Sequence, residues 1–185
     1  MGALVKSGKH ELAATMEEQA QQYLTFLLGG EMFAIGILNI KEIIEYGQLT
    51  EVPMMPEFIR GVINLRGAVV PVVDLSARFG RKRTEITRRT CIVIIEVESG
   101  EDKHDVGVVV DSVSEVLEIP AGEIEPAPSF GAKIRADFIA GMGKVGGKFV
   151  ILLSVNNVLS LDDLAMLENA AGSEGALTPE VLGVQ

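Results

Sequence analysis

The side chains most often used in catalysis are few in this sequence and lie far apart. The two histidines are His10, in a polar N-terminal stretch, and His104, in a charged segment without an apolar pocket pattern. The single cysteine, Cys91, begins the strand-like run Cys-Ile-Val-Ile-Ile, where a thiol usually behaves as a small buried hydrophobe. A cysteine nucleophile needs a base within hydrogen-bond reach, and no histidine accompanies Cys91. We therefore expect no enzyme, and no set of carboxylates and histidines has the spacing of metal ligands.

The glycine cluster from Gly141 to Lys148 could bind phosphate if its backbone N–H groups formed a cradle ahead of a helix. The pattern departs from a phosphate loop at Met142 and at Phe149, which takes the place of Ser or Thr. A strand-like run rather than a helix follows. The cluster is better explained as the glycine-rich tip of a β-hairpin, and we expect no cofactor.

Two other groups of charged residues each allow a structural and a functional interpretation. Asp74 ends a strand-like run before Leu-Ser-Ala-Arg, which is typical of a helix N-cap, although a binding role stays open. The stretch Arg78–Arg89 holds six of the chain's 16 basic residues and lacks apolar periodicity. It could recruit RNA or acidic lipid. Because it has no aromatic residue beyond Phe79 and the whole chain is acidic, we favour a solvated linker.

Arg66 is the residue best placed to bind a partner. It lies in the turn Asn64-Leu-Arg-Gly67 between two apolar strand-like runs, where Asn64 tolerates turn geometry and Gly67 suits a positive φ. A hairpin-tip arginine is often only solvated. Here its neighbours are Val, Ile and Leu, and an arginine on an apolar surface is a common interface anchor that can pair with a carboxylate.

Strands must supply most of the scaffold around these residues, because alternating apolar runs bounded by turns recur along the chain. Strands are expected at Tyr23–Leu28, Met32–Ile37, Thr90–Val97 and Asp105–Val110, and hairpins at Val62–Val73 and Phe138–Ser154. Other expected elements are a short helix or bent strand at Leu38–Glu45, a turn or helix at Leu75–Phe79, loops at Glu98–His104 and Pro120–Ser129, and a terminal helix at Leu161–Ala170 after a capping box.

An internal repeat relates two parts of the chain. Phe138–Gly141 matches Phe58–Gly61 at an offset of 80, and Phe33–Glu45 resembles Val106–Glu118 at an offset of 73. Two units are too few for a solenoid, so we interpret them as paired small β-modules that share a core. The second unit has Gly146 in place of Arg66 and Ser154 in place of Asp74. Any function of Arg66 therefore belongs to one copy, and the other copy keeps only the scaffold.

Composition narrows the function further. With 185 residues, 48% of them apolar, the chain can bury a core, while a net charge of −10 disfavours a general nucleic-acid role. Aromatic residues make up 5% and tryptophan is absent, so stacking surfaces for bases or sugars are scarce. A single cysteine suits a reducing cytosol, and no apolar run is long enough to span a bilayer. We expect a soluble intracellular protein.

The chain resembles the CheW-like adaptor family of bacterial chemotaxis. The strongest match is Phe58–Leu75, with others at Ile37–Ile44, Gly107–Val113 and Ile124–Pro128. The resemblance implies an all-β fold of two SH3-like five-stranded β-barrels on a common apolar core, with short helices and a C-terminal helix. It covers a CheW-like domain at residues 21–170, which leaves a flexible tail at 1–20 and a flexible extension at 171–185.

The resemblance also implies a non-catalytic role in the cytoplasm. Family members couple methyl-accepting chemotaxis receptors to the histidine kinase CheA in signalling arrays at the inner face of the membrane. The expected partners are the receptor tips and the regulatory domain of CheA, with weak self-association and no insertion into the membrane. By position in the family motifs, the partner-binding residues are Arg66, Ile40, Glu42, Gly61, Arg60 and Asn64. For Ile40, a place in the core is an equal alternative.

Overall fold

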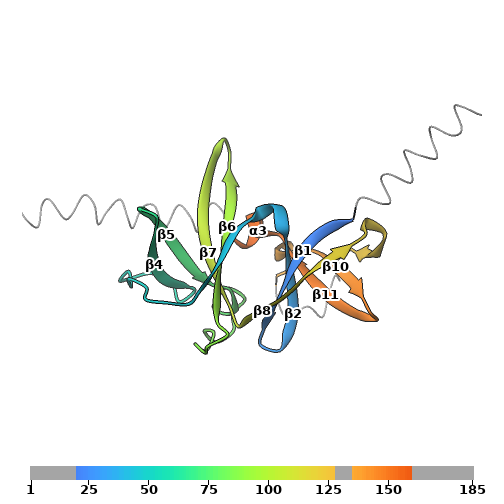
Figure 1. The fold of residues 1–185 in the computed structure, drawn as a ribbon, viewed down its shortest axis with the longest axis horizontal. Helices are drawn as coiled ribbons and strands as arrows, with labels where there is room; N and C mark the ends of the chain where they lie inside the picture. The colour runs from blue at the N-terminus through green and yellow to red at the C-terminus, as the bar shows by residue number, and fades with distance from the viewer. Residues whose placement is uncertain (1–19, 128–134, 160–185) are drawn as a thin grey trace, which may run out of the picture.

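The fold is all-β and consists of two twisted sheets with short helices between them. It is seen here in a computed structural model that describes residues 20–127 and 135–159 (Figure 1). In that part of the chain, no helix is long and apolar enough to cross a membrane. The two sheets form separate lobes, and the β6–β7 hairpin rises well above both of them.

Chain order and spatial order differ, because each sheet combines strands from distant parts of the sequence. One sheet has the order β8-β1-β2-β11-β10-β9, and the other has the order β3-β6-β7-β5-β4. The first sheet comprises β1 Gln21–Leu28, β2 Glu31–Gly36, β8 Ser112–Ile119, β9 Ile124–Glu125, β10 Ile139–Val145 and β11 Lys148–Leu153. The second comprises β3 Ile40–Glu45, β4 Ile59–Leu65, β5 Ala68–Asp74, β6 Cys91–Ser99 and β7 Asp102–Val110. The helical turns are η1 Ile37–Asn39, α2 Leu75–Arg78, η2 Ala121–Glu123, η3 Ala136–Phe138 and α3 Val155–Val158.

The internal repeat appears directly in the strand order. The order β3-β6-β7-β5-β4 of one sheet corresponds, strand for strand, to β8-β1-β2-β11-β10 of the other. Both sheets contain one parallel pair at the same place, β5 with β7 and β11 with β2, among antiparallel neighbours. Strands β3 and β8 each leave the sheet of the preceding strand and join the other one. The repeated units are therefore intertwined rather than consecutive.

Each sheet curls until the segment after one edge strand contacts the opposite edge strand, and a glycine lies at that contact. In the five-stranded sheet, Thr50 and Val62 exchange two backbone hydrogen bonds, 2.9 and 2.8 Å long, which join the segment after β3 to β4. Gly61 has φ 149°, and a Cβ there would lie 2.3 Å from the carbonyl oxygen of Thr50. In the other sheet β9 makes the equivalent contact with β10, and a Cβ on Gly141 would lie 2.7 Å from Cγ2 of Ile124. Both copies of the repeat thus leave no room for a side chain at this glycine, and the restriction comes from the chain itself.

Three buried apolar clusters hold the fold together. The largest includes Phe26 and Phe33 from one sheet, Val108 from the other and Phe138 from η3, and so forms the shared core. A smaller cluster lies within each sheet, around Val72 in one and Leu152 in the other. Because these four side chains of the largest cluster are at most 1% exposed, the shared core is continuous between the lobes. The predicted fold class is confirmed, with β9 as a sixth strand in one sheet.

One loop prediction was wrong, and a second segment is held more firmly than a linker needs to be. Glu98–His104 is not a loop, because β6 and β7 continue as a long two-stranded ribbon as far as the Ser99–Asp102 pair. Charged residues on both faces hid the strands, since this ribbon projects beyond the apolar core. The predicted solvated linker at Arg78–Arg89 begins in α2 and continues as a largely exposed loop, and its backbone is hydrogen-bonded to the folded body at Lys82 and Thr84.

Other predictions agree with the structure apart from small shifts of the boundaries. Both repeat hairpins form, the predicted turn or helix at Leu75–Phe79 is α2, and Leu38–Glu45 contains the end of η1 followed by β3. β8 had no predicted counterpart, and the expected loop after Pro120 contains η2 and β9. The expected helix at Leu161–Ala170 and the two expected flexible ends lie outside the described residues, apart from residue 20.

Candidate partner-binding site

The β4–β5 hairpin presents Arg66 at its tip by a tight turn. Arg66 has φ 53° and Gly67 has φ 87°, the pair of positive values that a two-residue type I′ turn requires. The side-chain oxygen of Asn64 accepts a hydrogen bond of 2.9 Å from the Gly67 N–H. Arg66 is one of two described non-glycine residues with positive φ. The chain therefore keeps an arginine at a position where glycine would be less strained. The matching position of the second hairpin has a glycine, Gly146.

Two of the predicted site residues meet at this tip. The Nη2 atom of Arg66 lies 2.7 Å from Oε2 of Glu42, on β3 at the opposite edge of the sheet. The Arg66 side chain is 78% exposed and that of Glu42 is 23% exposed. Sheet closure brings these edges together. Because Arg66 has five N–H donors, most of its hydrogen-bonding capacity remains available to a partner carboxylate.

The surface of each sheet also exposes apolar side chains at matching repeat positions. In the five-stranded sheet, Ile43 on β3 is 43% exposed and Val69 on β5 is 71% exposed. Their counterparts at offsets of 73 and 80 are Val116 on β8, 46% exposed, and Phe149 on β11, 50% exposed. Single exposed apolar side chains are common on protein surfaces, but their recurrence at matching positions of both copies makes these four candidate contact residues. Sequence reasoning missed all four, although applying the strand period to the aligned repeats would have found them.

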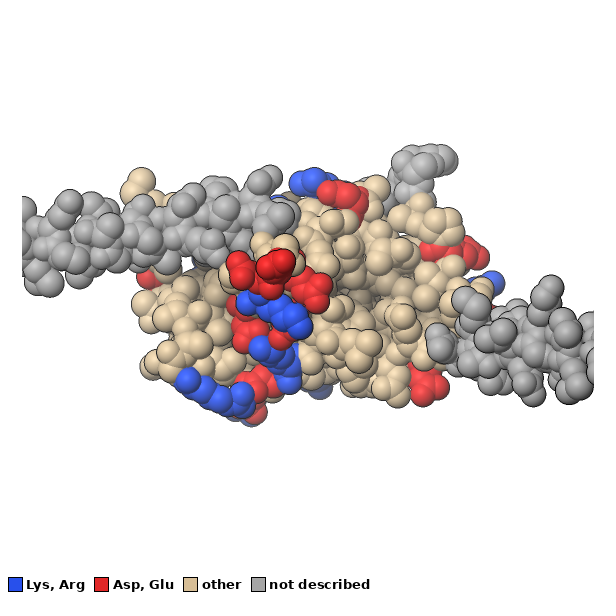
Figure 2. All heavy atoms as spheres, turned by 90° about the horizontal axis from the view of Figure 1, so that it is seen from above, with Lys and Arg blue, Asp and Glu red and all other residues tan. Residues whose placement is uncertain are grey.

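An ion-pair network fixes β3 against the long β6–β7 hairpin. Lys41 Nζ lies 2.8 Å from Asp105 and 3.1 Å from Glu96, which also pairs with Lys103 at 3.3 Å. Hydrogen bonds to Asp105 and Glu96 raise the pKa of Lys41, and those from Lys41 and Lys103 lower the pKa of Glu96. Figure 2 shows acidic and basic side chains gathered together on the face from which the hairpin rises, with uncharged surface on either side.

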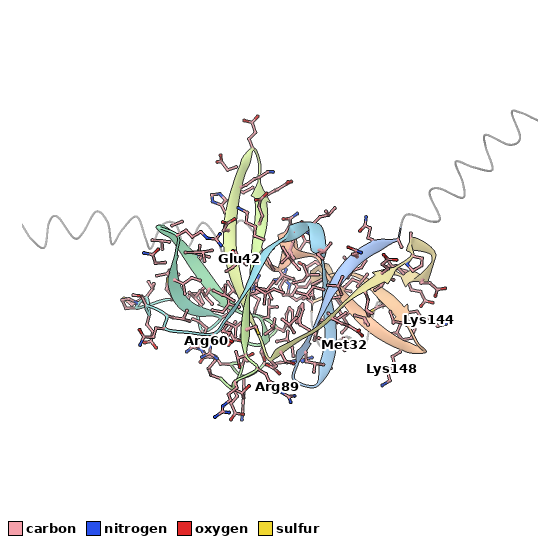
Figure 3. The ribbon with its side chains drawn as sticks, in the orientation of Figure 1. Met32, Glu42, Arg60, Arg89, Lys144 and Lys148 are labelled. Carbon is pink, nitrogen blue, oxygen red and sulfur yellow. The ribbon has the colours of Figure 1, made fainter. Side chains whose placement is uncertain are left out.

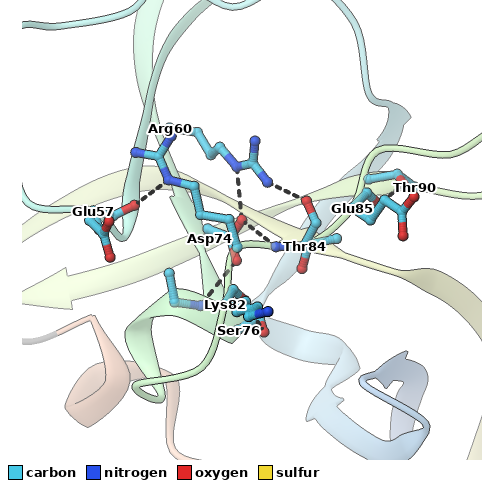
Figure 4. A network of polar contacts seen from close by, with 10 residues as sticks. Glu57, Arg60, Asp74, Ser76, Lys82, Thr84, Glu85 and Thr90 are labelled. Atoms are coloured by element: carbon cyan, nitrogen blue, oxygen red, sulfur yellow. Dashed lines mark hydrogen bonds and ion pairs between the residues drawn. The ribbon is translucent and has the colours of Figure 1, made fainter.

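Arg60 belongs to a buried network beneath the hairpin (Figure 4). Its Nε lies 2.8 Å from Oδ2 of Asp74, and its Nη2 donates to the carbonyl oxygen of Thr84. Asp74 is fully buried and also accepts from the backbone N–H groups of Ala77 and Thr84. The predicted N-cap of α2 is therefore confirmed. The Arg60 side chain is only 14% exposed, so its visible role is to neutralise a buried carboxylate.

The remaining predicted residues are less accessible. Ile40 is partly buried and packs against the shared core, in agreement with the core alternative. Gly61 is buried at the closure of the sheet. Arg66, Glu42 and Asn64 form one group at the hairpin tip, whereas Arg60 and Gly61 support the base of the same hairpin. Among the described residues, no group of His, Cys, Asp and Glu could hold a metal ion.

Comparison with known proteins identifies relatives along most of the chain. The profile of the CheW-like domain matches residues 22–163. Chemotaxis protein CheW of Klebsiella aerogenes is 36% identical over 157 residues, which cover 85% of this chain and 92% of that protein. Protein FrzA of Myxococcus xanthus is 30% identical, over 72% of this chain and 81% of that protein.

A solved structure agrees with these sequence matches. The scaffolding protein TtCheW from Thermoanaerobacter tengcongensis superposes with a TM-score of 0.70 at 30% identity, covering 78% of this chain and 91% of that one. The intertwined sheets, the paired hairpins and these matches lead to one conclusion: the chain belongs to the CheW-like domain family of chemotaxis scaffold proteins.

Proposed function

We propose that this protein is a non-catalytic adaptor that couples methyl-accepting chemotaxis receptors to the histidine kinase CheA in cytoplasmic signalling arrays. It acts by holding both partners at once on separate surfaces. The observation that carries this proposal is the Arg66–Glu42 pair, an exposed arginine set by a strained turn beside a carboxylate in only one of two matching hairpins. A purely structural turn would favour glycine, as at Gly146.

Arg66 and Glu42 are assigned to the receptor-binding surface, together with Asn64, which fixes the turn. An acidic receptor tip would compete with Glu42 for the guanidinium of Arg66, and the freed carboxylate could then bind a basic group. Arg60 and Gly61 contribute by holding the hairpin in place. Ile40 supports β3 from the core side.

The repeat offers a reason why one chain can serve two partners. Both sheets expose two apolar side chains at matching positions, Ile43 and Val69 in one and Val116 and Phe149 in the other, but only the five-stranded sheet adds an arginine at the hairpin tip. The second surface is proposed to bind the regulatory domain of the kinase, and copies of the chain associate weakly through the same surfaces. Each contact needs only micromolar affinity, because an array raises the effective concentration of every partner.

The Glu42→Lys variant tests the proposal. A lysine at position 42 removes the carboxylate and repels the basic receptor group that Glu42 is proposed to bind, so calorimetric titration should show weaker binding of a receptor cytoplasmic fragment. The thermal midpoint should stay close to that of the wild type, because surface ion pairs contribute at most about 1 kcal/mol. Glu115→Lys, at the equivalent place in the second unit, is the matched control for receptor binding. Unchanged receptor affinity in Glu42→Lys would contradict the assignment of this surface.

A further inference from the structure

The basic loop, defined as residues 79–90, stands out in an acidic molecule. It carries five Lys or Arg residues and one Glu, a net charge of +4, whereas the whole chain has a net charge of −10. Four of its basic residues are exposed, and these are Lys82, Arg83, Arg88 and Arg89. The acidic residue Glu85 is exposed as well. In Figure 3, Arg89 is labelled near the lower end of the five-stranded sheet. The proposed adaptor role uses none of these residues.

The folded body holds the basic loop in one conformation. Thr84 donates its N–H to the buried carboxylate of Asp74 at 3.0 Å, and the Ser76 hydroxyl donates to the carbonyl oxygen of Lys82 at 2.7 Å. Arg83 Nε donates to the carbonyl oxygen of Glu57 at 2.9 Å (Figure 4). The cations are thus presented from a fixed backbone, so little backbone entropy is lost when an anionic segment binds.

In the part of the chain that the structure describes, few of these cations are neutralised nearby. Within residues 20–127 and 135–159, the ion pair formed by the loop is the one between Arg81 and Glu31, at 3.3 Å. Clustered like charges repel one another, and a segment of opposite charge relieves that repulsion. The loop is therefore suited to an acidic peptide.

The chain itself carries such a peptide, and it starts beside the loop. Residues 160–185 contain five acidic residues and no Lys or Arg. Arg78, the last residue of α2 before the loop, donates from Nε to the carbonyl oxygen of Val158 at 2.8 Å. Asp162 and Asp163 follow Val158 by four and five residues, so an extended chain can carry them about 15 Å from that point.

We propose that the acidic segment 160–185 docks on the basic loop of the same molecule. Each ion pair is worth little at a surface, but the short tether gives the segment a millimolar effective concentration at the loop. The docked segment covers the cations, so an acidic partner reaches the loop only by displacing it. This inference is independent of the adaptor role, because its test involves no receptor or kinase.

The test uses the full chain with Cys91→Ser and Ser173→Cys and a nitroxide spin label at position 173. At low salt, the label should selectively broaden the amide NMR signals of residues 82–89. The broadening should disappear in about 1 M salt, where the Debye length is about 3 Å. It should also disappear in Arg88→Glu/Arg89→Glu and return when Asp162→Lys/Asp163→Lys is added. The matched control is Lys144→Glu/Lys148→Glu, the same charge change on the β10–β11 hairpin (Figure 3), which should leave the broadening unchanged.

Three results would overturn the proposal. One is the absence of broadening in the loop at low salt. Another is broadening that survives both high salt and Arg88→Glu/Arg89→Glu, since the contact would then not depend on the charges of the loop. The third comes from a mixture of spin-labelled unenriched chains and isotope-enriched unlabelled chains. Equal broadening in that mixture would show that the segment binds a second copy instead.

Discussion

At the residue scale, Arg66 combines a conformational cost with an exposed charge. The left-handed backbone conformation of Arg66 costs about 1–2 kcal/mol of stability. The ion pair between Arg66 and Glu42 stabilises the fold by at most about 1 kcal/mol. Its position at a hairpin tip could be predicted from Asn64 and Gly67. Its pairing with Glu42 could not, because 23 residues separate the two and only closure of the sheet brings them together.

Arg66→Gly separates binding from stability. The variant copies Gly146, so the unfolding free energy should stay within about 1 kcal/mol of the wild type or rise. Receptor affinity should fall by about 1–3 kcal/mol, because a central charged anchor is lost. Urea unfolding and calorimetric titration measure the two effects. A large loss of stability with unchanged affinity would make Arg66 a structural residue.

Glu96 gives the protein a defined response to acid. Hydrogen bonds from Lys41 and Lys103 lower its folded pKa below the ordinary value of 4.5, so its stabilising contribution is fully present above 4.5 and is lost as the pH falls through the folded pKa. Glu96→Gln should therefore destabilise the protein near neutral pH and have a vanishing effect in acid. Urea unfolding at a series of pH values checks this, with Glu98→Gln as control. A Glu96→Gln effect that does not change with pH would refute the ion-pair account.

At the scale of elements, the β4–β5 and β10–β11 hairpins have the same fold but differ in the side chains that hold them in place. The apolar alternation, the glycine turns and the N-cap at Asp74 are local features, so the sequence was enough to predict them. The exchange of strands between the sheets was not predictable in this way. It depends on β3 and β8 crossing to the other sheet, and no local pattern marks such a crossing. The ribbon at Glu98–His104 was missed because this part of its strands lies outside the core and carries charges on both faces.

Gly61 closes its sheet and tolerates no side chain. A Cβ would meet the Thr50 carbonyl oxygen at 2.3 Å, and φ is 149°, so Gly61→Ala should cost about 1–3 kcal/mol of unfolding free energy. Hydrogen exchange at the Thr50 and Val62 amides should accelerate, because their backbone bonds open. Gly47→Ala is the control, since a Cβ there meets nothing within 4 Å. Wild-type stability in Gly61→Ala would show that the closure is not constrained.

The Arg60–Asp74 pair is present in one hairpin, whereas the other has Ala140 and Ser154 at the matching positions. Asp74→Ser alone leaves the arginine without its counter-charge and should cost about 3–5 kcal/mol. The double variant Arg60→Ala/Asp74→Ser copies the second hairpin and should lose less than Asp74→Ser alone. Denaturant unfolding of both singles and the double gives the coupling energy. Strictly additive losses would mean that the two side chains act independently.

At the scale of the whole molecule, two intertwined sheets on one core present related but unequal surfaces in fixed relative positions. The continuous shared core, including Phe26, Phe33 and Phe138, keeps them from moving independently. Such a body suits a scaffold, because the geometry of an array depends on the angle between its two contacts. Family membership extends over residues 22–163, so this architecture accounts for most of the chain.

The most direct test of the adaptor role is autophosphorylation of the kinase in a reconstituted mixture of receptor, CheA and this protein. Receptor control of the kinase should appear only when the protein is present, and Arg66→Gly should lose it while remaining folded. In separate binding titrations, metal chelation should leave the affinities of this protein for the receptor and for CheA unchanged. If the receptor controls the kinase equally well without this chain, the adaptor account is contradicted.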